Sequence, residues 1–205
     1  MDAIAVSPPL AGEPAPGEAP ARERLIEAAS RLFCRYGINA VGVDTVVAEA
    51  GTAKATLYKA FGSKEKLVEA VLEREGRQWR DWFLAGIDAG EGGAVEGLRR
   101  IFPLLEDWFA QDRFYGCPFI NAIGEHDKAE DRLRAITIAH KKAVLGRIES
   151  LAMEAGAHDP NRLAHQLGLL IDGAIVVAMI SRDPGAARLA AEAAESLFAA
   201  LERSA

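Results

Sequence analysis

Apolar residues recur at helical spacing near the start of the chain, between residues 22 and 36. The repeating positions are Leu25, Ala28, Ala29, Leu32, Phe33 and Tyr36. Steps of three and four residues place such side chains on one face of an amphipathic helix. Gly37 follows directly and is suited to close a helix in the left-handed conformation. The pattern predicts a first helix with one buried face.

Residues 45–61 read as two short helices joined at Gly51. A steep turn between helices needs a residue that accepts a positive φ angle, which glycine does without steric cost. Ala48 and Ala50 are small enough to let the two backbones approach each other. This arrangement predicts a helix-turn-helix.

The second short helix is predicted to be amphipathic. Ala53, Leu57, Ala60 and Phe61 fall on its inner side. The outer side carries Lys54, Ala55, Thr56, Tyr58 and Lys59. Ammonium and phenol groups can bind DNA phosphates, while a hydroxyl and a methyl group can contact base edges. The alternative is an ordinary solvated helix face with lysines that bind nothing.

A further helix is predicted to begin just after Ser63. The serine is suited to cap it, Glu65 lies in its first turn, and Leu67 and Val71 begin its apolar face. The first N–H groups of this helix, together with Lys64, can hold a phosphate.

These residues, taken together, resemble the amino-terminal domain of the TetR/AcrR family of transcriptional regulators. The matching positions are Arg24 to Phe33, Tyr36-Gly37, Ala50-Gly51, Lys54, Thr56-Leu57-Tyr58, Phe61 and Ser63 to Leu67. The resemblance implies that Tyr58 and Lys64 contact phosphates and that positions 54–56 approach bases. Thr45 joins the predicted DNA-binding set. Gly42 and Ala60 depart from the family pattern, and both departures remove a side chain that could contact phosphate.

The resemblance and the helical periodicity together predict an all-α, TetR-like fold of about nine helices. Residues 1–20 are rich in Pro, Ala and Gly, have no periodicity, and are expected to form a disordered, passive arm. Residues 21–66 form the predicted helix-turn-helix domain. Residues 67–205 form the predicted ligand-binding and dimerisation domain.

Aromatic residues gather in the middle of the chain, around a helix that contains Pro103 and is therefore expected to bend. They predict a site for a small apolar or aromatic effector, with a few polar groups to orient it. The expected lining is Trp79, Phe83, Phe102, Leu105, Phe109, Cys117, Asn121, Glu125 and His140. Two alternatives stay open: the aromatic residues simply fill a core, and His140 is a neutral core histidine rather than a ligand or a proton sensor.

Asp159-Pro160 and Asp183-Pro184 each combine a helix cap with a proline suited to the first turn, so they are expected to open the last two helices. The first of these helices is apolar on all sides, which predicts a partner subunit. The family resemblance also implies a four-helix dimer interface. The expected interface residues are Leu170, Gly173, Ala174, Val177, Ala190, Ala194 and Leu197.

The formal net charge of −6 first argues against a nucleic-acid partner. The charge is unevenly distributed, however: residues 22–66 carry a net charge of +3 and the rest of the chain −9. This asymmetry would direct one end of the molecule to DNA. No apolar run long enough for a membrane span and no signal peptide is recognised, so a cytoplasmic protein with reduced Cys34 and Cys117 is expected.

The leading hypothesis is a ligand-responsive repressor that binds a palindromic DNA operator as a homodimer, with no cofactor, metal or membrane partner. A ligand-independent DNA-binding protein is the first alternative. An enzyme that uses Cys117 with Glu125 and His126 is the second, although the sequence offers no third partner at a suitable spacing. The sequence leaves the effector, the operator and the sign of regulation open.

Overall fold

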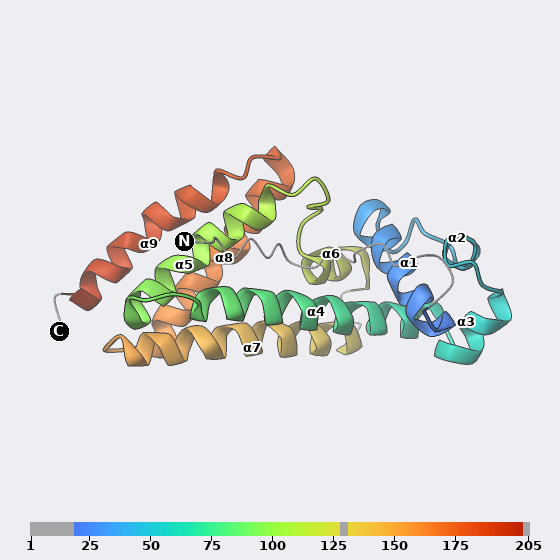
Figure 1. Cartoon of the computed structure of the whole chain (residues 1–205), viewed down its shortest axis with the longest axis horizontal. Helices are drawn as coiled ribbons and strands as arrows, with labels where there is room; N and C mark the ends of the chain where they lie inside the picture. The colour runs from blue at the N-terminus through green and yellow to red at the C-terminus, as the bar shows by residue number, and fades with distance from the viewer. Residues whose placement is uncertain (1–18, 128–130, 203–205) are drawn as a thin grey trace. The chain divides into compact units, whose positions relative to one another are not determined.

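The structure is a computed structural model that describes residues 19–127 and 131–202. Over these residues it contains nine α-helices and no strand, which confirms the predicted all-α fold (Figure 1). The helices are α1 (Ala21–Tyr36), α2 (Val43–Glu49), α3 (Lys54–Phe61), α4 (Lys64–Asp88), α5 (Gly93–Phe109), α6 (Pro118–Glu125), α7 (Asp131–Glu154), α8 (Pro160–Ser181) and α9 (Ala186–Glu202). The predicted amino-terminal arm lies almost wholly outside the described residues.

Local capping explains several of these boundaries. Ser63 Oγ accepts the backbone N–H of Lys66 at 3.2 Å, which caps α4 as predicted. Asp159 does the same for α8 by accepting the N–H of Arg162 at 3.0 Å. The prediction for Asp183-Pro184 is wrong, because α9 begins two residues later, at Ala186. Asp183 Oδ1 instead accepts the N–H of Gly185 at 2.8 Å and stabilises a turn before the helix.

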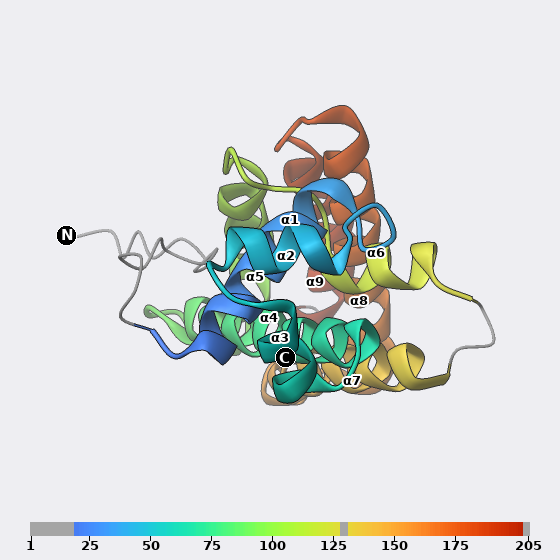
Figure 2. The same ribbon diagram turned by 90° about the vertical axis from the view of Figure 1, so that its right-hand side faces the viewer.

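The chain divides into two compact units. The first, here called the helix-turn-helix unit, comprises residues 19–78, 117–127 and 131–138. In this unit α1, α2 and α3 pack on one another, and Figure 2 faces these three helices. Leu25, Val46 and Leu57 are almost completely buried at their centre. Tyr36 does not belong to the buried face, because 55% of its surface is exposed.

The second unit, here called the core unit, comprises residues 79–116 and 139–202. Helices α5, α8 and α9 pack side by side in it (Figure 1). The largest fully buried side chains of this unit include Phe83, Phe102 and Phe198. Pro103 lies inside α5, as the sequence predicted.

The predicted boundary at residue 66 is not where the compact units divide. Helix α4 runs without a break from Lys64 to Asp88, so the end of the sequence motif is not the end of a packed body. Helix α6 and the start of α7 also belong to the helix-turn-helix unit. They join it by contacts between residues far apart in the sequence, which a local pattern cannot show.

Helix α8 is long and apolar enough to cross a membrane, judged by length and composition alone. This corrects the expectation that no segment of the chain reaches that length. In the structure the helix instead buries one face, which includes Leu167, Ile171 and Ala178, within the core unit.

Candidate nucleic-acid interface and effector core

The turn between α2 and α3 has the predicted geometry and is held by a residue of α1. Gly51 has φ +58°, and the N–H of Thr52 donates to the carbonyl of Val47 at 2.9 Å. Arg24 Nε donates to the carbonyl of Ala50 at 3.1 Å, and its Nη2 donates to the carbonyl of Gly51 at 3.4 Å. Sequence reasoning missed this clamp, because the acceptors are backbone atoms some 26 residues away.

Helix α3 is anchored by one side chain and presents the others outward. Leu57 is fully buried, whereas Lys54, Ala55, Tyr58 and Lys59 are exposed. Thr56 is half-buried, and Thr45 is exposed on α2. The predicted DNA-facing set of α3 is therefore gathered on its accessible side.

The inner face of α3 is narrower than the periodicity predicted. Ala53 and Ala60 are exposed, and Phe61 is only half-buried. The guanidinium of Arg22 lies 5.2 Å from the centre of the Phe61 ring, a cation–π distance. The reason is that α3 is only eight residues long and, of these residues, only Leu57 is buried.

Two of the three lysines expected to hold phosphates already have protein partners. Lys54 Nζ lies 2.9 Å from Asp44 Oδ1 on α2, and the hydrogen bond with Asp44 raises the pKa of Lys54. Lys64 Nζ donates to the carbonyl of Ile38 at 2.6 Å, in the loop between α1 and α2. Lys64 therefore holds this loop, whether or not it also contacts DNA.

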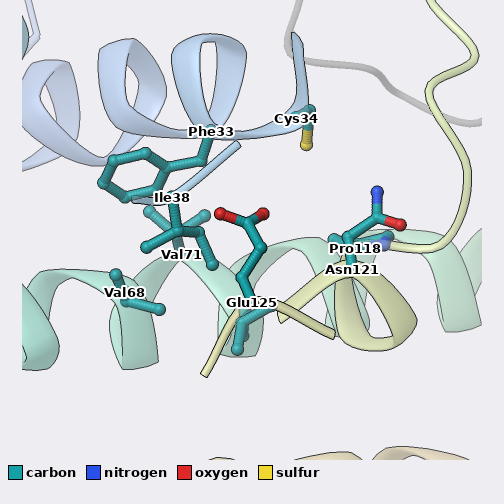
Figure 3. Close-up of a pocket in the computed structure, with 9 residues that line it drawn as sticks. Phe33, Cys34, Ile38, Val68, Val71, Pro118, Asn121 and Glu125 are labelled. Carbon is teal, nitrogen blue, oxygen red and sulfur yellow. The ribbon is translucent and has the colours of Figure 1, made fainter. Parts of the chain in front are cut away.

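Glu125, predicted as an effector ligand, instead binds the same loop. Its Oε2 accepts the backbone N–H of Asn39 at 2.9 Å, and its main-chain oxygen accepts Asn39 Nδ2 at 2.7 Å. Figure 3 shows its carboxylate pointing from α6 toward the end of α1 and Ile38. The sequence carried no signal for this contact, since Asn39 and Glu125 are 86 residues apart.

Asn121 and Glu125 line a small cavity inside the helix-turn-helix unit. The other lining residues are Phe33, Cys34, Ile38, Val68, Val71, Leu72 and Pro118 (Figure 3). Its volume is about 20 Å³, which is room for a water rather than for an aromatic effector. Cys117 is buried as the residue that precedes α6.

Four predicted effector residues of the core unit, Trp79, Phe83, Phe109 and His140, belong to one aromatic cluster that also contains Trp108. Trp79 stacks on Phe83 with ring centres 4.4 Å apart and lies 5.4 Å from Trp108. Phe102, Leu105 and Phe109 are buried as predicted. Trp79 Nε1 is buried and has no hydrogen-bond partner among the residues that the structure describes, an arrangement that costs free energy.

His140 belongs to this aromatic cluster and is held neutral. Its ring centre is 5.7 Å from that of Trp79, and only 6% of its surface is exposed. Burial, with smaller effects of Arg80 and Lys141, lowers its pKa to about 3. Because Arg80 Nη1 can only donate, His140 Nδ1 accepts its hydrogen bond at 2.9 Å. This geometry agrees with the alternative of a neutral core histidine.

The predicted dimer residues separate into two groups. Ala174, Ala190 and Ala194 are buried within the chain itself, so the expectation that they face a partner needs correction. Leu170 and Leu197 are half-buried, whereas Gly173 and Val177 are exposed. Leu169 and Ile180, which the prediction omitted, are 75% exposed and extend the accessible apolar face of α8.

The side chains named for a thiol enzyme are engaged elsewhere. Cys117 is 4% exposed, and Glu125 binds Asn39. The ring of His126 donates from Nδ1 to the carbonyl of Ala122 at 2.8 Å. These contacts do not form a nucleophile with a base.

Comparisons with known proteins agree with this geometry. Residues 25–71 match the family profile of bacterial regulatory proteins of the tetR family, and residues 94–194 match a tetracyclin repressor-like C-terminal domain. A TetR-family transcriptional regulator from Streptomyces coelicolor superposes with a TM-score of 0.80 at 28% identity, over 88% of this chain and 95% of that chain. A TetR-type regulator from Streptomyces avermitilis is 30% identical with a TM-score of 0.74, over 86% of this chain and 99% of that chain.

A curated helix-turn-helix transcriptional regulator of Mycobacterium tuberculosis is 38% identical over 58 residues. This match covers 28% of the present chain and 29% of that protein, so it spans less than a third of either.

Proposed function

Because this chain belongs to the TetR family of DNA-binding transcriptional regulators, we propose that it is a ligand-responsive repressor that binds a palindromic operator as a homodimer. The observation that carries the proposal is α3, which is held by buried Leu57 and clamped at its turn by Arg24. A short helix fixed in this way can present its outer side chains to the major groove.

The exposed side chains of α3 suit the two tasks of DNA recognition. Lys54, Lys59 and Tyr58 would bind phosphates and fix the register, whereas Ala55 and Thr56 would meet base edges. Thr45 on α2 would add a backbone contact. Lys54 would exchange Asp44 for phosphate, at a small cost because an exposed ion pair contributes little stability.

The homodimer is supported by the accessible face of α8. Leu169, Gly173, Val177 and Ile180 follow one another at spacings of four, four and three residues. Leu189 on α9 is a further exposed apolar side chain. An isologous contact between such faces would relate two copies of α3 by a two-fold axis, which is why the operator is proposed to be a palindrome.

The effector is proposed to be a small apolar or aromatic molecule bound among the aromatic residues of the core unit. The buried Trp79 Nε1 favours a guest with a hydrogen-bond acceptor, which would satisfy the indole N–H. Coupling to DNA would require a free-energy difference between two arrangements of the protein. The continuous helix α4 and the contact of Glu125 with Asn39 are the elements suited to transmit it.

A cytoplasmic location follows from the DNA partner, and we propose it on that ground. The competing function is a DNA-binding protein without an effector. It differs in one measurable respect, since its operator affinity would not change with any small molecule.

Selection of bound DNA from a random pool tests the DNA-binding proposal. We expect enrichment of a palindrome whose half-sites are separated by about one helical turn or a multiple of it. The full chain is used, and Leu57 is left unchanged because it anchors α3. Tyr58→Phe, which alters a phosphate contact, and Thr56→Ala, which alters a base contact, are tested in parallel. Enrichment of a single, unrepeated half-site would contradict the homodimer.

A thermal-shift screen of aromatic and acyl compounds tests the effector site. A compound that stabilises the protein should lose its effect in Phe102→Ala, which removes a buried aromatic side chain. Its effect should weaken in Trp79→Phe, which keeps a smaller aromatic ring but removes the N–H donor. The melting temperature of each variant without compound is the control. Stabilisation that survives both changes would place the effector elsewhere, and a bound compound without effect on operator affinity would favour the competing function.

A further inference from the structure

A second cavity lies inside the helix-turn-helix unit, beside the first turns of α4. Its volume is about 220 Å³, smaller than the roughly 300–1,000 Å³ of pockets for drug-sized ligands. The lining residues are Glu65, Val68, Glu69, His126, Arg132 and Leu133. A guest here would be about the size of a small metabolite, and none of these side chains belongs to the predicted effector set.

The lining combines acceptors with an apolar floor. Glu65 and Glu69 are one helical turn apart on α4, so both carboxylates face the same side. Val68 lies between them and is 1% exposed, and Leu133 on α7 is 5% exposed. Hydrogen bonding to Ser63 and to its own backbone, with a smaller effect of Lys64, lowers the pKa of Glu65. Glu65 is therefore a carboxylate at neutral pH.

His126 adds a further acceptor. Its Nδ1 donates to the carbonyl of Ala122, because a carbonyl oxygen can only accept. In the neutral form of the ring, this tautomer carries its lone pair on Nε2. Two carboxylates and this nitrogen match the three N–H donors of an ammonium group.

Arg132 supplies the opposite charge. Its Nη1 donates to Glu69 Oε1 at 3.0 Å, and Lys66 Nζ binds Glu69 Oε2 at 2.8 Å. The Arg132 side chain is 55% exposed and that of Glu69 is 13% exposed, so a guest that opens this pair has to supply both replacements: an ammonium for Glu69 and a carboxylate for Arg132. A guanidinium also pairs with a carboxylate in a bidentate geometry.

We propose that this cavity binds a free α-amino acid with a short aliphatic side chain. The ammonium group lies against Glu65, Glu69 and His126, the carboxylate pairs with Arg132, and the aliphatic side chain covers Val68 and Leu133. A molecule with a single charge would leave one side of the cavity unmatched. The site would be a polar input separate from the apolar effector, and its binding can be measured without DNA.

Titration calorimetry with three molecules of one hydrocarbon skeleton tests this proposal. L-valine carries both charges, isobutylamine lacks the carboxylate, and 3-methylbutanoate lacks the ammonium. We expect saturable binding of L-valine, with the other two at least about tenfold weaker. No saturable L-valine binding, or equal binding of either analogue, would overturn the proposal.

Two variants locate the site. In Arg132→Gln, L-valine should no longer bind more tightly than isobutylamine. In Glu65→Gln, L-valine should no longer bind more tightly than 3-methylbutanoate. Lys142→Gln and Glu73→Gln are matched controls, because both side chains are exposed on the same helices outside the cavity. Unaltered preferences in Arg132→Gln and Glu65→Gln, with helix content and melting temperature retained, would place L-valine elsewhere and refute the assignment.

Discussion

At the scale of single residues, Gly37 shows how a distant side chain decides which amino acid fits. Its φ is +87°, and a Cβ atom built there would lie 3.0 Å from Oε2 of Glu125. Glycine is thus favoured twice: by its backbone angle, and because any Cβ atom would displace the Glu125 carboxylate by a few tenths of an ångström. Gly62 has a similar φ, +82°, with ψ −39° instead of 154°, and no atom of the described residues lies within 4 Å of the added carbon.

We therefore expect Gly37→Ala to destabilise the protein more than Gly62→Ala. A positive φ costs about 1 kcal/mol or more at each position, and the contact with Glu125 should add about 1 kcal/mol at Gly37. Denaturant unfolding measures both values. In the Glu125→Ala background the cost of Gly37→Ala should fall by about 1 kcal/mol, whereas that of Gly62→Ala should not change. A Gly37→Ala cost that is the same in both backgrounds would contradict the role given to Glu125.

Glu75 is a buried carboxyl whose partner is a hydroxyl. Ser30 Oγ donates to its Oε1 at 2.5 Å, and burial raises the pKa of Glu75. The folded protein therefore favours the protonated form. The stability that protonated Glu75 contributes is fully present below its pKa in the unfolded chain. It is lost as the pH rises through its pKa in the folded protein.

Glu75→Gln should accordingly raise the free energy of unfolding at pH 7 by on the order of 1 kcal/mol, since the amide keeps an acceptor for Ser30 without a charge. At pH 4 the gain should vanish, because the Glu75 carboxyl of the native protein is then protonated and is uncharged like the amide of the variant. Unfolding curves at both pH values are the measurement, with exposed Glu73→Gln as the control. A gain of the same size at both would refute the burial argument.

At the scale of elements, α8 shows that an apolar sequence does not reveal which face is accessible. Ala174 and Val177 are three residues apart on it, yet Ala174 is 5% exposed and Val177 is 50% exposed. Packing of α8 against α5 and α9 produces the difference. The two positions therefore separate folding from assembly.

Val177→Arg is expected to yield a folded monomer, because a charge would lie unpaired in the proposed dimer contact. Ala174→Arg should instead unfold the chain, with a loss of several kcal/mol, because it buries the charge inside the core unit. Light scattering and circular dichroism distinguish the two results. A native chain that is monomeric at micromolar concentration would refute the dimer.

The start of α4 carries a separable prediction for Lys64. If Lys64 acts by holding the carbonyl of Ile38, Lys64→Met should lower operator affinity and melting temperature without changing the salt dependence. A phosphate contact would instead reduce the slope of log affinity against log salt by about one unit. We expect an unchanged salt dependence for Lys64→Met. Lys59→Met, which changes an exposed lysine, should instead reduce the slope.

At the scale of the whole molecule, the pH dependence of stability depends on groups such as His140. Its pKa of about 3 lies far below the 6.5 of an unperturbed histidine. The unfolded chain thus binds the proton first. The contribution of neutral His140 to the free energy of unfolding is fully present above its pKa in the unfolded chain. It is lost as the pH falls from about 6.5 toward 3.

Between pH 7 and pH 5, His140 should account for a loss of about 2 kcal/mol in the free energy of unfolding. His140→Gln, whose amide oxygen can still accept from Arg80, should show a correspondingly flatter profile. Urea unfolding at the two pH values is the measurement. The exposed His165→Gln is the control, and identical slopes for the native chain and His140→Gln would show that the histidine is not held neutral.

The sequence by itself determined the helices, the turn at Gly51, the family and the exposed set on α3, because these depend on spacing, capping and the angle of one glycine. Only the tertiary structure decided that Ala174, Ala190 and Ala194 are internal, that Lys64 binds Ile38, and that α6 belongs with the helix-turn-helix unit. The reason is physical: periodicity shows that a side chain is apolar or charged, but its partner depends on how separate helices pack. Glu125 and Asn39 meet across 86 residues of sequence through two hydrogen bonds that no local pattern encodes.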